Sequence, residues 1–162
     1  MDREKPLKNE IMKRHKSLVP FSRDHHYGLL CCWKIRQGIK KGIAAARIGL
    51  YVDYFWKTYL KQHFDEEERW LFQQDDLSLQ AIAEHRELEA LVGTLASAAA
   101  NDRLTIFADL LDRHIRFEER VLFPHLEATV PEEKLETIGA LLHESHIVPA
   151  TEDYTDAFWL ET

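Results

Sequence analysis

The chain has 162 residues, of which 45% are apolar and 30% are charged, as is typical of a globular domain. Its formal net charge of −7 argues against nucleic acid as the main partner, because phosphate binding needs a basic surface. No apolar run is long enough to cross a bilayer and the charged start lacks the apolar core of a secretory signal, so we expect no membrane association and a cytoplasmic location.

Apolar residues at helical spacing predict a first helix over about residues 22–37. Ser22 is its expected N-cap, and Asp24 is expected in its first turn. This helix carries the adjacent Cys31 and Cys32, which make a poor disulfide framework and suit a reducing compartment. We expect both thiols to be packing residues.

Further helical patterns follow, separated by short polar or glycine-containing stretches. The predicted segments are residues 44–72, 77–100 and 104–127, then a short helix from Pro131 to near Pro149. Because short connections make neighbouring helices antiparallel, the sequence predicts an all-α fold, an up-down-up-down antiparallel four-helix bundle with a short C-terminal extra helix. We expect one domain over 1–162, with the bundle at about 22–127 and the short helix and tail at 131–162.

A repeated motif stands late in two of these helices. The segment HFDEEERWLF begins at His63 and the segment HIRFEERVLF begins at His114, so both read His-x-x-x-Glu-Glu-Arg-x-Leu-Phe. Residues four apart lie on the same helical face. His63 with Glu67, and His114 with Glu118, can therefore each aim at one point.

Each repeat is preceded by a helix with an early histidine in an acidic context, Asp24-His25 and Glu84-His85. In an antiparallel bundle, the starts of the first and third helices lie at the same end as the ends of the second and fourth. His25 and His85 are therefore expected to join the repeated motifs in one layer. His26 is the alternative to His25, since its neighbours three and four residues on are also apolar; we prefer His25, which lies nearest the mean direction of the apolar face.

A buried group of imidazoles and carboxylates requires compensation, because isolated carboxylates are costly to bury. Metal cations supply it. A single His-x-x-x-Glu is often a solvated ion pair, but two matched copies with upstream histidines favour a metal centre. A nitrogen and oxygen ligand set without thiolate favours iron or manganese over structural zinc, and six side chains are too many for one zinc ion.

On these motifs the chain resembles the hemerythrin-like family, also called HHE cation-binding domains, over most of its length. The resemblance implies a four-helix bundle around a non-haem centre of two iron ions joined by an oxo or hydroxo bridge. By position, it implies that His63, His85 and His114 are iron ligands and that Glu67 and Glu118 are bridging carboxylates.

The sequence departs from the oxygen-carrying members of that family. They have His-x-x-x-His on the third helix, whereas Ala81 and Glu89 stand four residues before and after His85 here. They also have His-x-x-x-x-Asp on the fourth helix, where Glu119 stands five residues after His114. One histidine ligand is missing, so the pattern is closer to bacterial di-iron repair proteins of nitrosative stress and to iron-sensing domains, without the cysteine-bearing N-terminal domain of the repair proteins.

These features favour a binding protein over an enzyme. The first hypothesis is a di-iron centre that binds a small diatomic ligand such as oxygen or nitric oxide, or that handles or senses iron. The alternative is a di-iron enzyme of oxidative or nitrosative stress defence, acting in iron–sulfur cluster repair or on peroxide or oxygen. The richer carboxylate set of ferritin-like oxidases is absent, which ranks oxygenase chemistry lower. A structural bundle without metal is the third hypothesis.

Other polar residues carry weaker predictions. Glu66 and Glu68 are expected to be exposed, and Glu119 is either exposed or a hydrogen-bond partner of the ligands. His143 and His146 end the short fifth helix, where histidine suits a helix C-terminus. The alternative for one of them is a place covering the metal site.

Overall fold

The computed structural model describes residues 14–146 and 152–162. These residues form helices and turns and no strand, so the prediction of an all-helical fold is confirmed. The predicted end of the fifth helix near Pro149, like residues 1–13 of the predicted domain, lies outside the described residues. Within the described ranges, no helix combines the length and the apolar character needed to span a membrane.

The first long helix, α2 (Val19–Lys40), begins earlier than its apolar pattern suggests. It follows a 3₁₀ turn, η1 (Lys16–Leu18), and Pro20 lies in its first turn, where the missing N–H of proline costs nothing. The prediction of Ser22 as N-cap is wrong, because the backbone is already helical there. The Ser22 hydroxyl instead donates a hydrogen bond to Glu119 Oε2 at 3.1 Å.

The early start also places Asp24 beyond the first turn, contrary to the prediction. At the other end, Gly42 has φ of +72°, in the left-handed region that glycine adopts without a steric penalty. This residue ends the helix and reverses the chain.

The second long helix is continuous from Ala45 to Leu71, close to the predicted 44–72, but its winding changes along its length. Two stretches have π-helical hydrogen bonds, which hold an extra residue per turn and so redirect the side chains that follow. Its parts are α3 (Ala45–Phe55), η2 (Trp56–Leu60, π), α4 (Lys61–Glu66) and η3 (Glu67–Leu71, π).

The third and fourth long helices lie close to their predicted positions. Asp75 caps the third helix, since its side chain accepts a hydrogen bond from the Ser78 N–H at 2.7 Å. The fourth helix also contains a π stretch. The elements are α5 (Asp76–Ser97), α6 (Asn101–Phe117), η4 (Glu118–Leu122, π), α7 (Phe123–Thr129) and the short α8 (Glu132–Ser145).

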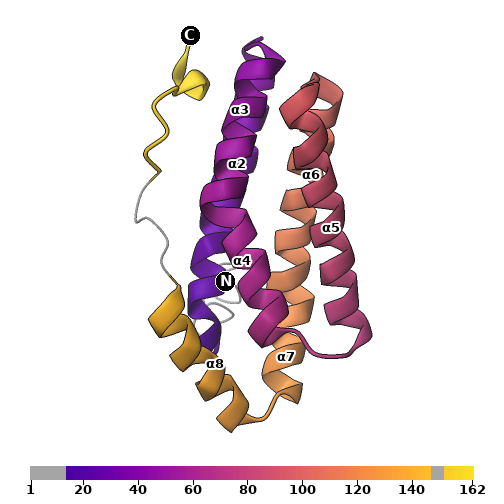
Figure 1. Ribbon diagram of the computed structural model, residues 1–162, viewed down its shortest axis with the longest axis vertical. Coiled ribbons are helices and arrows are strands. Elements are labelled where there is room, and N and C mark those ends of the chain that lie inside the picture. Colours follow the sequence, from indigo (N-terminus) through magenta and orange to yellow (C-terminus); the bar gives the residue numbers. More distant parts are fainter. Residues whose placement is uncertain (1–13, 147–151) are drawn as a thin grey trace, which may run out of the picture.

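The long helices pack side by side (Figure 1), with contacts between α2 and α6, α6 and α5, α5 and α3, and α3 and α2. The connections at residues 41–44 and 98–100 lie at the upper end of the view, and the connection at 72–75 lies at the lower end. Helix α8 covers the lower end of α2. The described tail then runs beside the upper part of α2 and ends in the 3₁₀ turn η5 (Phe158–Leu160).

The apolar core consists of two clusters, one on each side of a layer of buried polar residues. Along the second helix, Phe64 belongs to one cluster and Leu71 to the other. Along the fourth helix, Ile115 and Leu122 divide in the same way. The glutamates of the repeated motif lie between these pairs, so the fold holds them in a layer enclosed by apolar packing.

Candidate metal centre

The structure brings six of the predicted site residues together in this buried layer. Each is at most 4% exposed, and they come from all four long helices: His25 on α2, His63 and Glu67 at the junction of α4 and η3, His85 on α5, and His114 and Glu118 at the junction of α6 and η4. His26, the alternative for the first helix, is exposed and does not belong to this group. Its ring instead meets that of Tyr27.

The six residues form two overlapping groups that share both carboxylates, Glu67 and Glu118. One group adds His25 and His63, and the other adds His85 and His114; within each group the candidate donor atoms lie within 4.8 Å of one another. Glu67 Oε1 lies 3.2 Å from Nε2 of both His63 and His85, and so links the two groups. Each group, with its shared carboxylates, could hold a metal cation.

Glu118 links the groups from the opposite side. Its Oε1 lies 2.8 Å from His25 Nε2, and its Oε2 lies 3.3 Å from His114 Nε2. Both shared glutamates are also the first residues of π stretches, η3 and η4. Such local widening of a helix occurs often at functional sites, and here it falls at the same place in both repeats.

Every histidine of the cluster is oriented by a second carboxylate at its other ring nitrogen. The four Nδ1 donors and their acceptors are His25 to Glu119 at 3.1 Å, His63 to Asp24 at 2.9 Å, His85 to Glu68 at 2.7 Å and His114 to Glu84 at 2.7 Å. Because a carboxylate only accepts, each Nδ1 carries the proton and each Nε2 faces the shared glutamates. This is the outer shell that metal-binding histidines typically have.

These outer carboxylates follow the internal repeat. Asp24 and Glu84 each precede an early histidine and bind the late histidine of the same hairpin. Glu68 and Glu119 each follow a shared glutamate and bind the early histidine of the other hairpin. The outer hydrogen bonds of the two hairpins are therefore related by an approximate two-fold symmetry.

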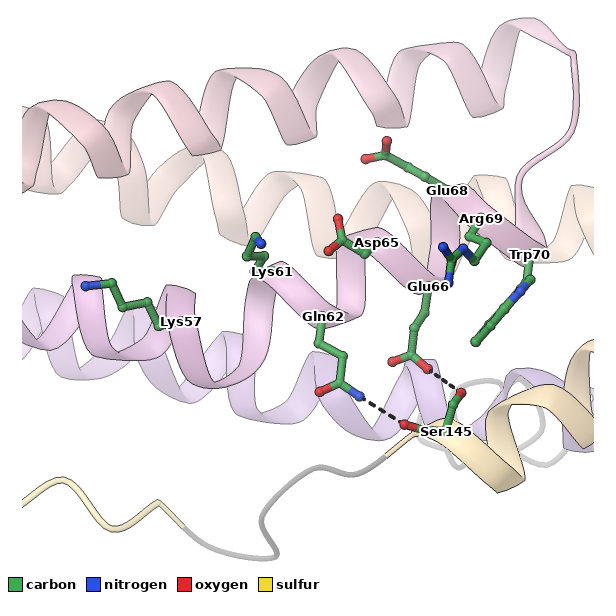
Figure 2. Close-up of a pocket in the computed structure, with 9 residues that line it drawn as sticks. All are labelled: Lys57, Lys61, Gln62, Asp65, Glu66, Glu68, Arg69, Trp70 and Ser145. Carbon is green, nitrogen blue, oxygen red and sulfur yellow. Dashed lines mark hydrogen bonds between the residues drawn. The ribbon is translucent and has the colours of Figure 1, made fainter.

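The prediction that Glu66 and Glu68 are exposed is wrong. Glu66 is 6% exposed and Glu68 is half-buried, because α8 and α5 cover the two flanks of α4 and η3 on which they lie. Figure 2 shows them pointing to opposite sides, with Glu66 directed toward Ser145 at the end of α8. For Glu119, the alternative of a hydrogen-bond partner of the ligands is the one that the geometry supports.

Helix α8 adds a contact to one half of the cluster only. His146 donates from Nδ1 to Glu66 Oε1 at 2.7 Å, and its Nε2 lies 3.1 Å from Asp24 Oδ2. Asp24 in turn binds His63, so His146 lies over the first hairpin and contacts the cluster through Asp24. His143 is exposed.

The cluster carries strong electrostatic coupling. Burial lowers the pKa of an imidazole, but hydrogen bonds to Glu118 and Glu119 outweigh it and raise the pKa of His25 to about 9. Burial also lowers the pKa of His85, but hydrogen bonds to Glu118, Glu67 and Glu68 outweigh it and raise that pKa to about 10. Burial would raise the pKa of Glu118, yet the surrounding imidazoles hold it well below its usual value. The carboxylates thus stabilise positive charge at this point.

Several polar atoms in the cluster are buried without any hydrogen-bond partner. They are Nε2 of His63, His85 and His114, both carboxylate oxygens of Glu67, and Oε2 of Glu118. Buried polar atoms nearly always have a partner, so a convergent set without one needs an explanation. Lone pairs of three imidazoles and two carboxylates that face one another fit metal cations in chemistry and in position.

Residues 34–126 match the family model of the hemerythrin HHE cation binding domain. The chain belongs to the hemerythrin HHE family. The resemblance predicted from the repeated motif is thereby confirmed, and the buried histidines and glutamates fit the cation binding for which this family is named. No curated protein and no solved structure matches the chain significantly. His25 precedes the matched range, so its place in the cluster rests on the geometry alone.

Proposed function

We propose that this hemerythrin-family protein holds two iron ions and binds a small diatomic ligand, oxygen or nitric oxide. The observation that carries the proposal is that both groups of donor atoms share Glu67 and Glu118. In this proposal His25 and His63 would hold one ion and His85 and His114 the other, and Glu67 and Glu118, which belong to both groups, would contribute to both sites. A pair of iron ions supplies redox-active positions for such a ligand.

The protein residues orient the ligands and keep the site dry. The four carboxylates at Nδ1 fix the tautomer and direction of each imidazole. The Phe64 ring stacks on His85 at 3.7 Å between centroids, and the Phe123 ring stacks on His25 at 5.4 Å. These rings limit the access of water to the cluster.

A small apolar cavity supports the choice of a diatomic ligand. It adjoins His25, His63 and His114, and its volume of about 10 Å³ is the size that holds one water-sized molecule. Its other walls are mostly apolar, with residues such as Phe55 and Leu111. A site of this size and polarity suits a small, weakly polar molecule better than an organic substrate.

We further propose that the chain forms an up-down-up-down four-helix bundle and acts in the cytoplasm. The helix contacts and the alternating ends of the connections in Figure 1 support that topology. Two buried free cysteines, Cys31 and Cys32, support a reducing compartment.

Metal analysis tests the proposal directly. Chain expressed with iron and purified without oxygen should hold about two iron ions, and its optical spectrum should change on addition of oxygen or nitric oxide. Glu67→Ala and Glu118→Ala should lose the metal, whereas Glu89→Ala, at an exposed position of α5, should keep it. One zinc ion or no metal under these conditions would contradict the proposal, as would full iron content in both bridging variants.

A further inference from the structure

A second cavity opens beside the candidate metal centre, between the start of α2 and the fourth helix, with His25 and Glu119 of that centre in its wall. Its volume is about 540 Å³, within the range of small-molecule sites. Apolar and basic side chains both line it. They include Val19, Leu29 and Ile115 on the apolar side and Arg14, Arg23, Arg116 and Arg120 on the basic side.

Two of these arginines already have acidic partners. Arg14 binds Glu119 at 3.0 Å and also pairs with Glu127, while Arg116 binds Asp112 at 2.6 Å. Glu119, the one acidic residue in the lining, is therefore satisfied by Arg14 in addition to its bond to His25. No carboxylate of the lining is left to neutralise a further arginine.

The other two arginines, Arg23 and Arg120, have no acidic partner among the residues that the structure describes. Both are exposed and stand at the same cavity. The chain as a whole carries a net charge of −7, so two guanidinium groups at one cavity, neither of them paired with a described carboxylate, run against its general charge. Guanidinium groups bind carboxylates in a planar, two-pronged geometry.

We propose that this cavity binds a small organic anion, a carboxylate with a hydrocarbon body. Its carboxylate lies at Arg23 and Arg120, and its hydrocarbon part packs against Val19, Leu29 and Ile115. The size of the cavity limits the ligand to a small molecule, and the overall negative charge opposes a polyanion. The contacts proposed for the ligand are with Arg23, Arg120 and the apolar wall, although His25 and Glu119 of the neighbouring centre also line the cavity.

Calorimetric titration of the full chain tests the proposal with hexanoate, acetate and 1-hexanol as probes. Hexanoate should bind more tightly than acetate, which lacks the hydrocarbon body, and more tightly than 1-hexanol, which lacks the charge. The double variant Arg23→Gln/Arg120→Gln should weaken hexanoate binding by about tenfold or more, because two charge-assisted hydrogen-bonding partners are lost. Arg103→Gln, an exposed arginine at the far end of α6, is the matched control and should bind as the parent does.

The proposal is overturned if the parent chain does not bind hexanoate, if the double variant binds it equally well, or if hexanoate and 1-hexanol bind equally. Acetate as tight as hexanoate would also overturn it, because the apolar wall would then contribute nothing. Metal-free and iron-loaded chains should give the same order of affinities. A failure here is thus distinct from a failure of the iron proposal, which metal analysis measures.

Discussion

Glu84 controls the orientation of a candidate ligand without itself facing the shared glutamates. Burial would raise its pKa, but the hydrogen bond to His114 Nδ1 lowers it, so Glu84 accepts as a carboxylate. Glu84→Ala should weaken iron binding by about 10- to 100-fold, because the His114 ring loses the partner that fixes its tautomer. Competition with a chelator measures this. Glu87→Ala, exposed on the same helix, is the control, and equal affinities in the two variants would contradict the role of Glu84.

The adjacent histidines of α2 allow a second comparison. His25→Ala should lower the iron content strongly, because His25 is 4% exposed and belongs to the cluster. His26→Ala should leave it nearly unchanged, because His26 is exposed. Metal analysis checks both, with circular dichroism to show equal helicity. Loss of iron from the His26 variant alone would mean that α2 is rotated by one residue from the orientation described.

At the level of elements, the cap of α5 contributes to stability separately from the metal. Asp75→Ala removes the side chain that accepts from the Ser78 N–H and from His125 Nε2 at 3.2 Å. We expect the free energy of unfolding to fall by about 1 kcal/mol in urea titrations of the metal-free chain. Gln74→Ala, exposed and one residue earlier, should change it by less than about 0.5 kcal/mol. A similar loss in both variants would mean that the connection, and not the cap, is responsible.

Hydrophobic periodicity predicted where the long helices lie, because each must bury one face. It did not predict the start of α2, where Pro20 permits an earlier first turn than Ser22 suggested. The π stretches that begin at Glu67 and Glu118 were also missed, since one extra residue in a turn leaves no clear mark in the spacing of apolar residues.

The inner residues of the candidate centre followed from the repeated motif, but their outer partners did not. In the sequence Asp24 and Glu84 stand beside His25 and His85, yet the histidines that they bind, His63 and His114, lie on other helices. Such pairing depends on how the helices are rotated against one another, which a single sequence does not specify. The adjacent glutamates in each repeat were the available signal, since two acids in a row near a cation site suit one inner and one outer position.

At the level of the whole molecule, the C-terminal tail completes the core beside the upper part of α2. Phe158 is fully buried and packs against Tyr51, with ring centroids 5.7 Å apart. A Cβ atom at Gly38 would lie 2.7 Å from Phe158 Cε2, so glycine is needed there for this contact. Glu152 binds the buried Lys34 and accepts from the Tyr51 hydroxyl at 2.7 Å. The tail is therefore part of the fold.

Phe158→Ala should accordingly lower the free energy of unfolding by about 3–5 kcal/mol, through lost burial and the cavity left behind. Leu160→Ala in the same turn should change it by less than about 0.5 kcal/mol, because Leu160 is 67% exposed. Urea titrations followed by circular dichroism measure both. A small effect of Phe158→Ala would show that the bundle is stable without the tail.

The approximate two-fold relation of the outer carboxylates gives the molecule an internal reference. Asp24 and Glu84 occupy equivalent places, as do Glu68 and Glu119, so a change in one half has its counterpart in the same chain under the same conditions. His146 breaks the equivalence by covering only the half with Asp24. On the proposed two-ion site, a comparison of Asp24→Asn with Glu84→Gln would show how the half covered by His146 differs from the other half in metal affinity.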